Sequence, residues 1–226
     1  MRISLCTVPV EPDYRSLTPE VGSDEVFASP RAVSELPVMP KIAIVSLIKW
    51  MEKNGYTREA WDYYDIDMEL PSDERLERYF REYQPTVVGL SAVVSTCYSQ
   101  SRKISKMIRS VCPDAWIVLG GSLTASANVV LRKTDVDICV VGDGEITWVD
   151  FLNYVKSYGR DWNYDELLKI KGLAYLDQAG ELRSTGYGPA IPGSQQPMPD
   201  YGILQAGLKD RPEDISNYFR NALGSF

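Results

Sequence analysis

The chain has 226 residues, of which 44% are hydrophobic and 24% are charged, and its formal net charge is −7. This composition is typical of a globular protein, and the length suffices for one well-filled core. The acidic balance argues against a nucleic-acid partner, and no apolar run approaches the ~18 residues of a membrane-spanning helix. Because the sequence contains no histidine, histidine-based catalysis and imidazole metal ligation are excluded within these residues.

The first residues, MRISLCTVPV, lack the charged and apolar regions of a signal peptide and predict a strand over 1–9. We therefore expect a cytoplasmic protein without a membrane partner. The cysteines are widely spaced and form no local zinc or iron–sulfur motif, so we expect no metal site made by this chain. They are Cys6, Cys97, Cys112 and Cys139.

Residues 10–38 contain four prolines without clear periodicity and predict a long loop that leaves the carboxyl end of the first strand. A helix is expected over about 40–54, with proline in its first turn and Gly55 as its stop. Residues 60–67 predict a second strand, placed at a sheet edge because it is more polar. A helix over about 71–83 follows.

Three further strand–helix pairs come next. The strands are expected at 86–92, 116–120 and 136–142, and the helices at 99–111, 127–133 and 145–158. Continuous Val, Ile and Leu runs are typical of parallel strands that are covered on both faces, and the alternation predicts right-handed crossovers. We therefore predict an α/β fold: a three-layer α/β/α sandwich around a five-stranded parallel sheet of the flavodoxin-like or Rossmann-like type, with strand order 2-1-3-4-5.

The sequence pattern changes after residue 158. The expected parts are a small hairpin made of 167–176 and 181–183, a Pro/Gly-rich connector over 186–202 and a last helix over 210–226. We accordingly divide the chain into an α/β domain over 1–158 and a small C-terminal appendage over 159–226.

Three of the predicted strands end in small or polar residues: Ser91, Gly120-Gly121 and Gly142-Asp143-Gly144-Glu145. Ligands of open α/β sheets bind beyond the carboxyl ends of the strands, and glycines there leave room for a bulky group. Each signal also has a structural interpretation. Ser95 or Thr96 could cap a helix, the glycine pair could form a tight turn, and the acidic residues suit a helix N-terminus. No phosphate-binding glycine fingerprint of the common kinds is present.

The order TVVGLSAVVST, PDAWIVLGGSLTA and VDICVVGDGE resembles the cobalamin-binding domain that precedes the catalytic barrel in cobalamin-dependent radical S-adenosylmethionine enzymes. The resemblance covers roughly residues 1–158, and GLAYLDQAGELRSTG with QPMPDY resembles the connector to the barrel. It implies cobalamin as the cofactor and a C-terminal radical S-adenosylmethionine domain as a partner. In the parent enzyme it also implies a 4Fe–4S cluster and S-adenosylmethionine, whose CxxxCxxC motif does not occur in this sequence.

The resemblance also implies which positions hold the cofactor. The nucleotide tail is expected against Ser91, Val93, Ser95 and Thr96, against Gly120, Gly121 and Ser122, and against Gly142, Gly144 and Glu145. The loop that begins at Val8, Pro9 and Val10 is expected near the corrin ring. Since TVPVEPDYRS contains no histidine, the resemblance implies base-off binding without a histidine on the lower face of cobalt.

We therefore expect the cobalamin-binding module of a radical methyltransferase-type enzyme, truncated before its catalytic domain and without catalytic residues of its own. One alternative is a stand-alone corrinoid carrier or sensor. Another is a flavodoxin-like or receiver-like signalling domain. A receiver needs an acidic residue where Ser91 stands, however, and a flavodoxin needs a hydroxyl-rich loop where VPVEP stands.

Overall fold

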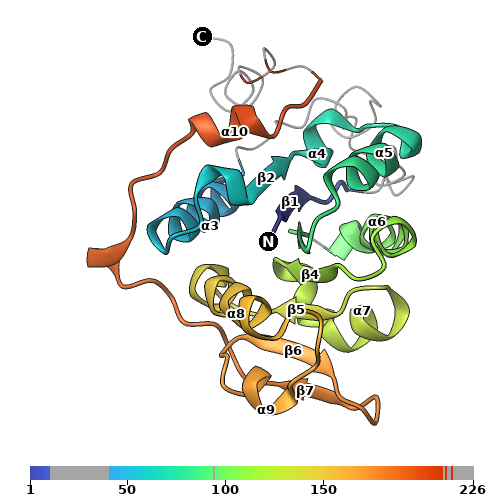
Figure 1. Cartoon of the computed structure of the whole chain (residues 1–226), viewed down its shortest axis with the longest axis vertical. Coiled ribbons are helices and arrows are strands. Elements are labelled where there is room, and N and C mark those ends of the chain that lie inside the picture. Colours follow the sequence, from blue (N-terminus) through green and yellow to red (C-terminus); the bar gives the residue numbers. More distant parts are fainter. Residues whose placement is uncertain (11–40, 94, 211, 213–214, 216–226) are drawn as a thin grey trace, which may run out of the picture.

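The computed structural model describes residues 1–10, 41–93, 95–210, 212 and 215, which fold around one seven-stranded sheet (Figure 1). The strands are β1 (Ile3–Thr7), β2 (Trp61–Tyr64), β3 (Val87–Ser91), β4 (Trp116–Gly120), β5 (Ile138–Val140), β6 (Leu173–Leu176) and β7 (Leu182–Ser184). Their order in the sheet is β2-β1-β3-β4-β5-β6-β7. Neighbours among the first five strands pair in parallel. The predicted order 2-1-3-4-5 is thus confirmed.

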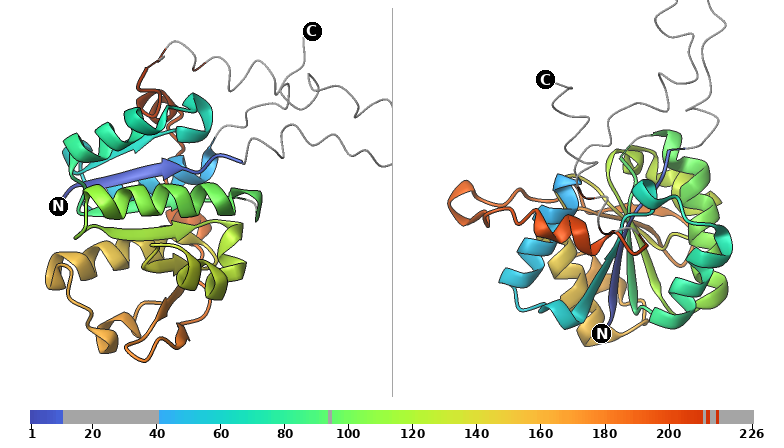
Figure 2. Two further views of the ribbon diagram at one scale, coloured as in Figure 1. Left: turned by 90° about the vertical axis from the view of Figure 1, so that its right-hand side faces the viewer. Right: turned by 90° about the horizontal axis from the view of Figure 1, so that it is seen from above.

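Helices cover both faces of the sheet, as the sandwich prediction requires (Figure 2). One face carries α3 (Ile42–Lys53) and α8 (Gly144–Tyr158), and the other carries α5 (Asp73–Tyr83), α6 (Tyr98–Val111) and α7 (Ala127–Lys133). The short helices are α4 (Ile66–Glu69), α9 (Tyr164–Leu167) and α10 (Gly202–Ala206). Single 3-10 turns are η2 (Arg58–Ala60), η3 (Ser95–Cys97), η4 (Ser122–Ser126) and η5 (Gly193–Gln195).

The central strands are buried on both sides because their alternate side chains enter two different cores. Leu5 and Val118 pack with α3 and α8, whereas Cys6 and Leu119 pack with α5, α6 and α7. All four cysteines are buried and unbonded to one another, so they pack as small hydrophobic side chains.

The prediction of a five-stranded sheet was wrong in one respect, because the C-terminal hairpin joins the same sheet. β6 pairs antiparallel with β5, and β7 pairs antiparallel with β6. This pairing satisfies the outer backbone groups of β5, which would otherwise form an open edge. The predicted strand over 167–176 was also too long, because α9 ends at Leu167 and β6 begins only at Leu173. The domain division at residue 158 stays a prediction.

Two predicted segments fall largely outside the described residues: the loop over 10–38 and the final helix over 210–226. The connector between β7 and α10 is described, and the chain from its start to residue 210 is attached at the ends of two parallel strands, β5 and β2. Gly188 forms a parallel bridge with Gly142, and its amide donates to the Val141 carbonyl over 2.7 Å. In Figure 1 the connector then passes outside α3 and reaches the β2 side of the sheet.

The second attachment lies at the carboxyl end of β2. The amide of Asp65 donates to the carbonyl of Gly207 over 2.9 Å, and Lys209 Nζ donates to Asp62 Oδ1 over 2.6 Å. The amide of Asp210 also donates to Glu69 Oε1 over 2.7 Å. The C-terminal stretch therefore covers the β2 edge, and α10 is a helix that the Pro/Gly-rich sequence did not reveal.

Candidate functional site

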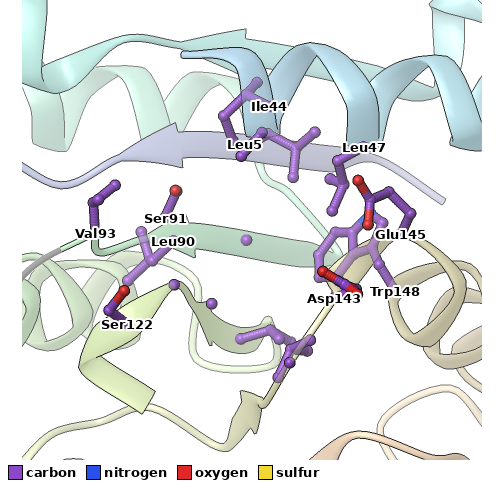
Figure 3. A pocket seen from close by; sticks show the side chains of 18 residues that line it. Leu5, Ile44, Leu47, Leu90, Ser91, Val93, Ser122, Asp143, Glu145 and Trp148 are labelled. Atoms are coloured by element: carbon purple, nitrogen blue, oxygen red, sulfur yellow. The ribbon is translucent and has the colours of Figure 1, made fainter. Parts of the chain in front are cut away.

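A cavity of about 280 Å³ lies at the carboxyl edge of the sheet, beneath α3 and the start of α8 (Figure 3). Its walls come from the sheet (Leu5, Gly89, Leu90, Ser91, Val93, Val118, Gly120, Gly121, Ser122 and Val140), from the turn and helix after β5 (Gly142, Asp143, Gly144, Glu145 and Trp148) and from α3 (Ala43, Ile44 and Leu47). The three strand ends singled out from the sequence thus meet around one space. Parallel strands bring their carboxyl ends to a common edge, which explains the convergence.

The inner end of the cavity is formed by Trp148 and Gly89. Gly89 lies in the middle of β3, in register with Leu5 on one side and Val118 on the other. A Cβ at Gly89 would lie only 2.8 Å from Leu5 Cδ2 and 3.0 Å from Trp148 Cη2. The space above this glycine is therefore filled by the tip of the indole ring, which is buried.

The glycine pair at the end of β4 has two distinct roles. A Cβ at Gly120 would meet no atom within 4 Å, so a side chain there would extend into open space beside the cavity. Gly121 has φ of +92°, and a Cβ there would lie 2.4 Å from the Ala92 carbonyl oxygen. Gly120 therefore keeps the cavity open, whereas Gly121 is required by its own backbone conformation.

Hydroxyl and carboxylate groups are found toward the mouth of the cavity. Ser91 is in register with Gly120, and Figure 3 shows its hydroxyl pointing into the space below α3. Neither Ser91 nor Ser122 forms a side-chain hydrogen bond to another described residue. Val93 is 58% exposed at the same edge and adds an apolar surface. These groups are free to contact a ligand.

The acidic turn before α8 is not a side-chain cap. Asp143 occupies the N-cap position without a capping hydrogen bond from its side chain. Glu145 instead accepts a hydrogen bond of 2.6 Å from Ser46 Oγ of α3. Helix α6 likewise begins after Cys97, so Ser95 and Thr96 are not its caps.

Five of the expected positions lie away from this cavity. Ser95 and Thr96 belong to η3 and do not line it. The Val8 side chain packs in the core on the opposite face of the sheet. Pro9 and Val10 line a second cavity of about 250 Å³ on that face, between α4, α5 and α6. Their expected place beside the corrin ring stays a prediction.

The sequence reasoning missed the contribution of α3 and the inner wall of the cavity. The helix over 40–54 was predicted without a role at the site, and Ile44, Leu47 and Trp148 were not singled out. One signal was available, because a glycine inside a strand marks a place where something approaches closely. Gly89 in VVGLS is such a residue.

The thiols of Cys6 and Cys139 are held in their unreactive, protonated form. Burial raises the pKa of Cys6 to about 12 and that of Cys139 to about 12, which keeps both protonated near neutral pH. Within the described residues, no group of three or more Cys, Asp or Glu side chains could hold a metal ion. The helices in this part of the chain include none that is long and apolar enough to cross a membrane.

Comparison with known proteins identifies the ligand of this fold. A family model described as "B12 binding domain" matches residues 36–152, which is more than half of the chain. The chain belongs to the B12-binding domain family. Cobalamin is therefore its cofactor, and the flavodoxin-like and receiver-like alternatives no longer apply.

Two curated relatives of this B12-binding domain are enzymes. The chain is 34% identical over 199 residues to the anaerobic magnesium-protoporphyrin IX monomethyl ester cyclase of Cereibacter sphaeroides, covering 86% of this chain and 29% of the cyclase. It is 24% identical over 132 residues to cytidylyl-2-hydroxyethylphosphonate methyltransferase of Streptomyces wedmorensis, covering 58% of this chain and 24% of that enzyme. The chain thus spans less than a third of either relative.

Solved structures share the fold. The cobalamin-dependent S-adenosylmethionine radical enzyme OxsB, with aqua-cobalamin and S-adenosylmethionine bound, matches with a TM-score of 0.67 at 15% identity, over 96% of this chain and 25% of OxsB. The radical S-adenosylmethionine methyltransferase TsrM from Kitasatospora setae matches with a TM-score of 0.57 at 20% identity, over 85% and 31% of the two chains. The B12-binding domain therefore has the Rossmann-like architecture found in these enzymes.

Proposed function

We propose that the B12-binding domain holds cobalamin in the base-off state, with the nucleotide tail inserted into the cavity between β3, β4, α3 and α8. The observation that carries this proposal is the open space beside Gly120, where any side chain would block the cavity. The cavity leads from polar groups at the sheet edge to an apolar inner end at Trp148. A nucleotide has the same order of groups, because its sugar and phosphate are polar and its base is flat and aromatic.

The size of the cavity supports the same assignment. Sites for whole small molecules usually measure roughly 300–1,000 Å³, and this cavity measures about 280 Å³. It therefore accommodates the tail but not the corrin macrocycle, which would lie outside along the carboxyl edge of the sheet. Exposed Val93 offers an apolar contact there. Ser122 offers a hydroxyl that can donate to or accept from the amides on the ring.

The position proposed for the nucleotide tail implies the base-off state. A base that is enclosed beside Gly120 and Trp148 is removed from the cobalt atom and cannot coordinate it. The sequence has no histidine to take its place. The carboxylates of Asp143 and Glu145 make their side of the mouth unfavourable for the tail phosphate. The phosphate is therefore expected nearer to Ser122.

We further propose that this domain is the N-terminal module of a cobalamin-dependent radical S-adenosylmethionine enzyme of the methyltransferase type, and that the chain is one part of that enzyme. The bound cobalamin would supply an organometallic methyl group, while the cluster and S-adenosylmethionine would be held by the rest of the enzyme. The likeness to OxsB and TsrM supports the proposal. The 29% coverage of the cyclase leaves room for such a domain. The chain's own residues would bind and orient the corrin and exclude water from its tail.

A retention experiment tests the binding mode. The chain is mixed with methylcobalamin, desalted and examined by visible absorption. We expect retained corrin whose absorption is shifted to shorter wavelength than that of free base-on cofactor. Gly120→Val should abolish retention, while Gly193→Val, at an open connector glycine far from the cavity, should not. Colourless wild-type protein, or a base-on spectrum, would contradict the proposal.

A further inference from the structure

We propose that the cavity selects corrinoids whose lower base is a benzimidazole over those with a purine base, and that its apolar inner wall, which includes Leu47 and Val140, determines this selectivity. This inference rests on the proposed function, because it requires the nucleotide tail to enter the cavity. The inference goes beyond the proposed function because it states which chemical class of corrinoid the domain accepts.

Among the residues that the structure describes, the inner part of the cavity offers a base no hydrogen-bond partner. Its walls are the apolar side chains of Leu5, Ile44, Leu47, Val118 and Val140. The backbone groups of the central strands are engaged with their neighbours in the sheet. The one polar atom of the inner wall, the indole nitrogen of Trp148, already donates to Met51 Sδ over 3.0 Å.

Ser91 supplies a hydroxyl beside this apolar region. It is two residues beyond Gly89 on the same strand, so both residues face the same side of the sheet. Its hydroxyl has no hydrogen-bond partner among the described residues and is therefore available to donate. The other polar groups lie at the mouth, where Glu145 is already bonded to Ser46.

One available hydroxyl beside apolar walls matches the hydrogen-bonding groups of a benzimidazole. One nitrogen of that base is bonded to the ribose, and the other is a single acceptor that Ser91 can satisfy. The remaining edge of the base is apolar and can pack against Leu47 and the indole of Trp148. Because the tip of the indole fills the space above Gly89, it also fixes how deep a base can enter.

A purine base does not match. It carries further ring nitrogens, and adenine also carries an amine, for which the inner cavity has no partners. Each buried polar group left without a hydrogen bond weakens binding by roughly 5- to 150-fold. We therefore expect the domain to bind cobalamin at least about tenfold more tightly than adeninylcobamide.

Titration of the chain with three corrinoids tests the inference and separates its failure from that of the proposed function. The probes are cobalamin, adeninylcobamide and cobinamide, which has no nucleotide tail. Tight cobalamin, weak adeninylcobamide and weak cobinamide binding is the expected result. Equal binding of cobalamin and adeninylcobamide would overturn the selectivity alone. Cobinamide binding as tightly as cobalamin would overturn the role of the cavity, and no binding of any corrinoid would overturn the proposed function.

Substitutions in the cavity wall test whether the selectivity arises in the cavity. Leu47→Gln introduces an amide into the wall and should reduce the preference for cobalamin over adeninylcobamide. Ile42→Gln makes a similar change on the exposed side of α3 and should leave the preference unchanged. If Leu47→Gln fails to fold by circular dichroism, Val140→Thr provides the same comparison with a nearly isosteric side chain. An unchanged ratio in the folded cavity variant would show that the selectivity arises elsewhere.

Discussion

Ser46 in α3 donates a hydrogen bond of 2.6 Å to Glu145 in the first turn of α8. The two residues are far apart in sequence, and the bond connects the two helices that cover the cavity. Hydrogen bonds to charged groups typically contribute about 1.5–3 kcal/mol. Both side chains are half-buried, so the lower part of this range applies here.

The first prediction concerns this bond. Ser46→Ala should lower the free energy of unfolding by about 1–2 kcal/mol, measured by urea denaturation. Ser157→Ala on α8 is the control, because its exposed hydroxyl bonds only to a carbonyl of its own helix. Equal effects of the two substitutions would show that the hydrogen bond between α3 and α8 contributes no more to the free energy of unfolding than a bond within one helix.

The second prediction separates the two glycines at the end of β4. Gly121→Ala should destabilise the fold by about 2 kcal/mol or more, because φ is +92° and the new Cβ meets the Ala92 carbonyl oxygen. Gly120→Val should leave the melting temperature of the ligand-free chain nearly unchanged, because its side chain enters open space. Thermal melts of both variants measure the difference, and a reversed order would contradict the assigned roles.

The third prediction tests the contact at the inner end of the cavity. Gly89→Ala should destabilise the domain by about 1–3 kcal/mol, because its methyl group overlaps Leu5 and the Trp148 indole. Trp148→Phe removes the overlapping part of the indole and should recover part of this loss in the double variant. A double-mutant cycle by denaturation measures the coupling. Strictly additive effects would mean that the two residues do not share this space.

The fourth prediction concerns alkaline pH. Burial raises the pKa of Cys6 and of Cys139 to about 12, whereas the pKa of a thiol in the unfolded chain is about 8.5. Between these values the folded state holds more protons than the unfolded state, so stability falls as pH rises. Urea denaturation should show a decline in unfolding free energy from about pH 8.5 upward. The Cys6→Ala and Cys139→Ala double variant should show a shallower decline than the parent.

Four of the five parallel strands could be predicted because each is a short, mostly apolar run between turn signals, whereas β2 (WDYY) is more polar and was expected at the sheet edge. The pairing of β6 with β5 could not be predicted, because the residues of Leu173–Leu176 do not indicate which edge of the sheet this strand joins. β7 is exposed along its whole length, so it carries no burial pattern that would place it. Short amphipathic segments are positioned by tertiary contacts, as α10 is by Gly207 and Lys209 at β2.

The residues at the rim of the candidate site could be predicted from the sequence, but the residues of its inner wall could not. Ser91, Gly120 and Gly142 end parallel strands, and topology alone places such ends together. Leu47 and Trp148 come from helices whose position over the sheet depends on packing. Ser95 and Thr96 do not line the cavity, because closeness in sequence to Ser91 does not place them there.

The attachment of Gly207 and Lys209 beside β2 fixes where the chain leaves the sheet. This exit is at the carboxyl edge, the same edge at which the cavity opens. Asp210 is therefore held on the side of the sheet where the cofactor cavity opens, and not at the far end of the molecule. Attachment on that side raises the effective concentration of the tethered chain relative to a bound corrin, so that even weak contacts between them suffice for repeated encounters.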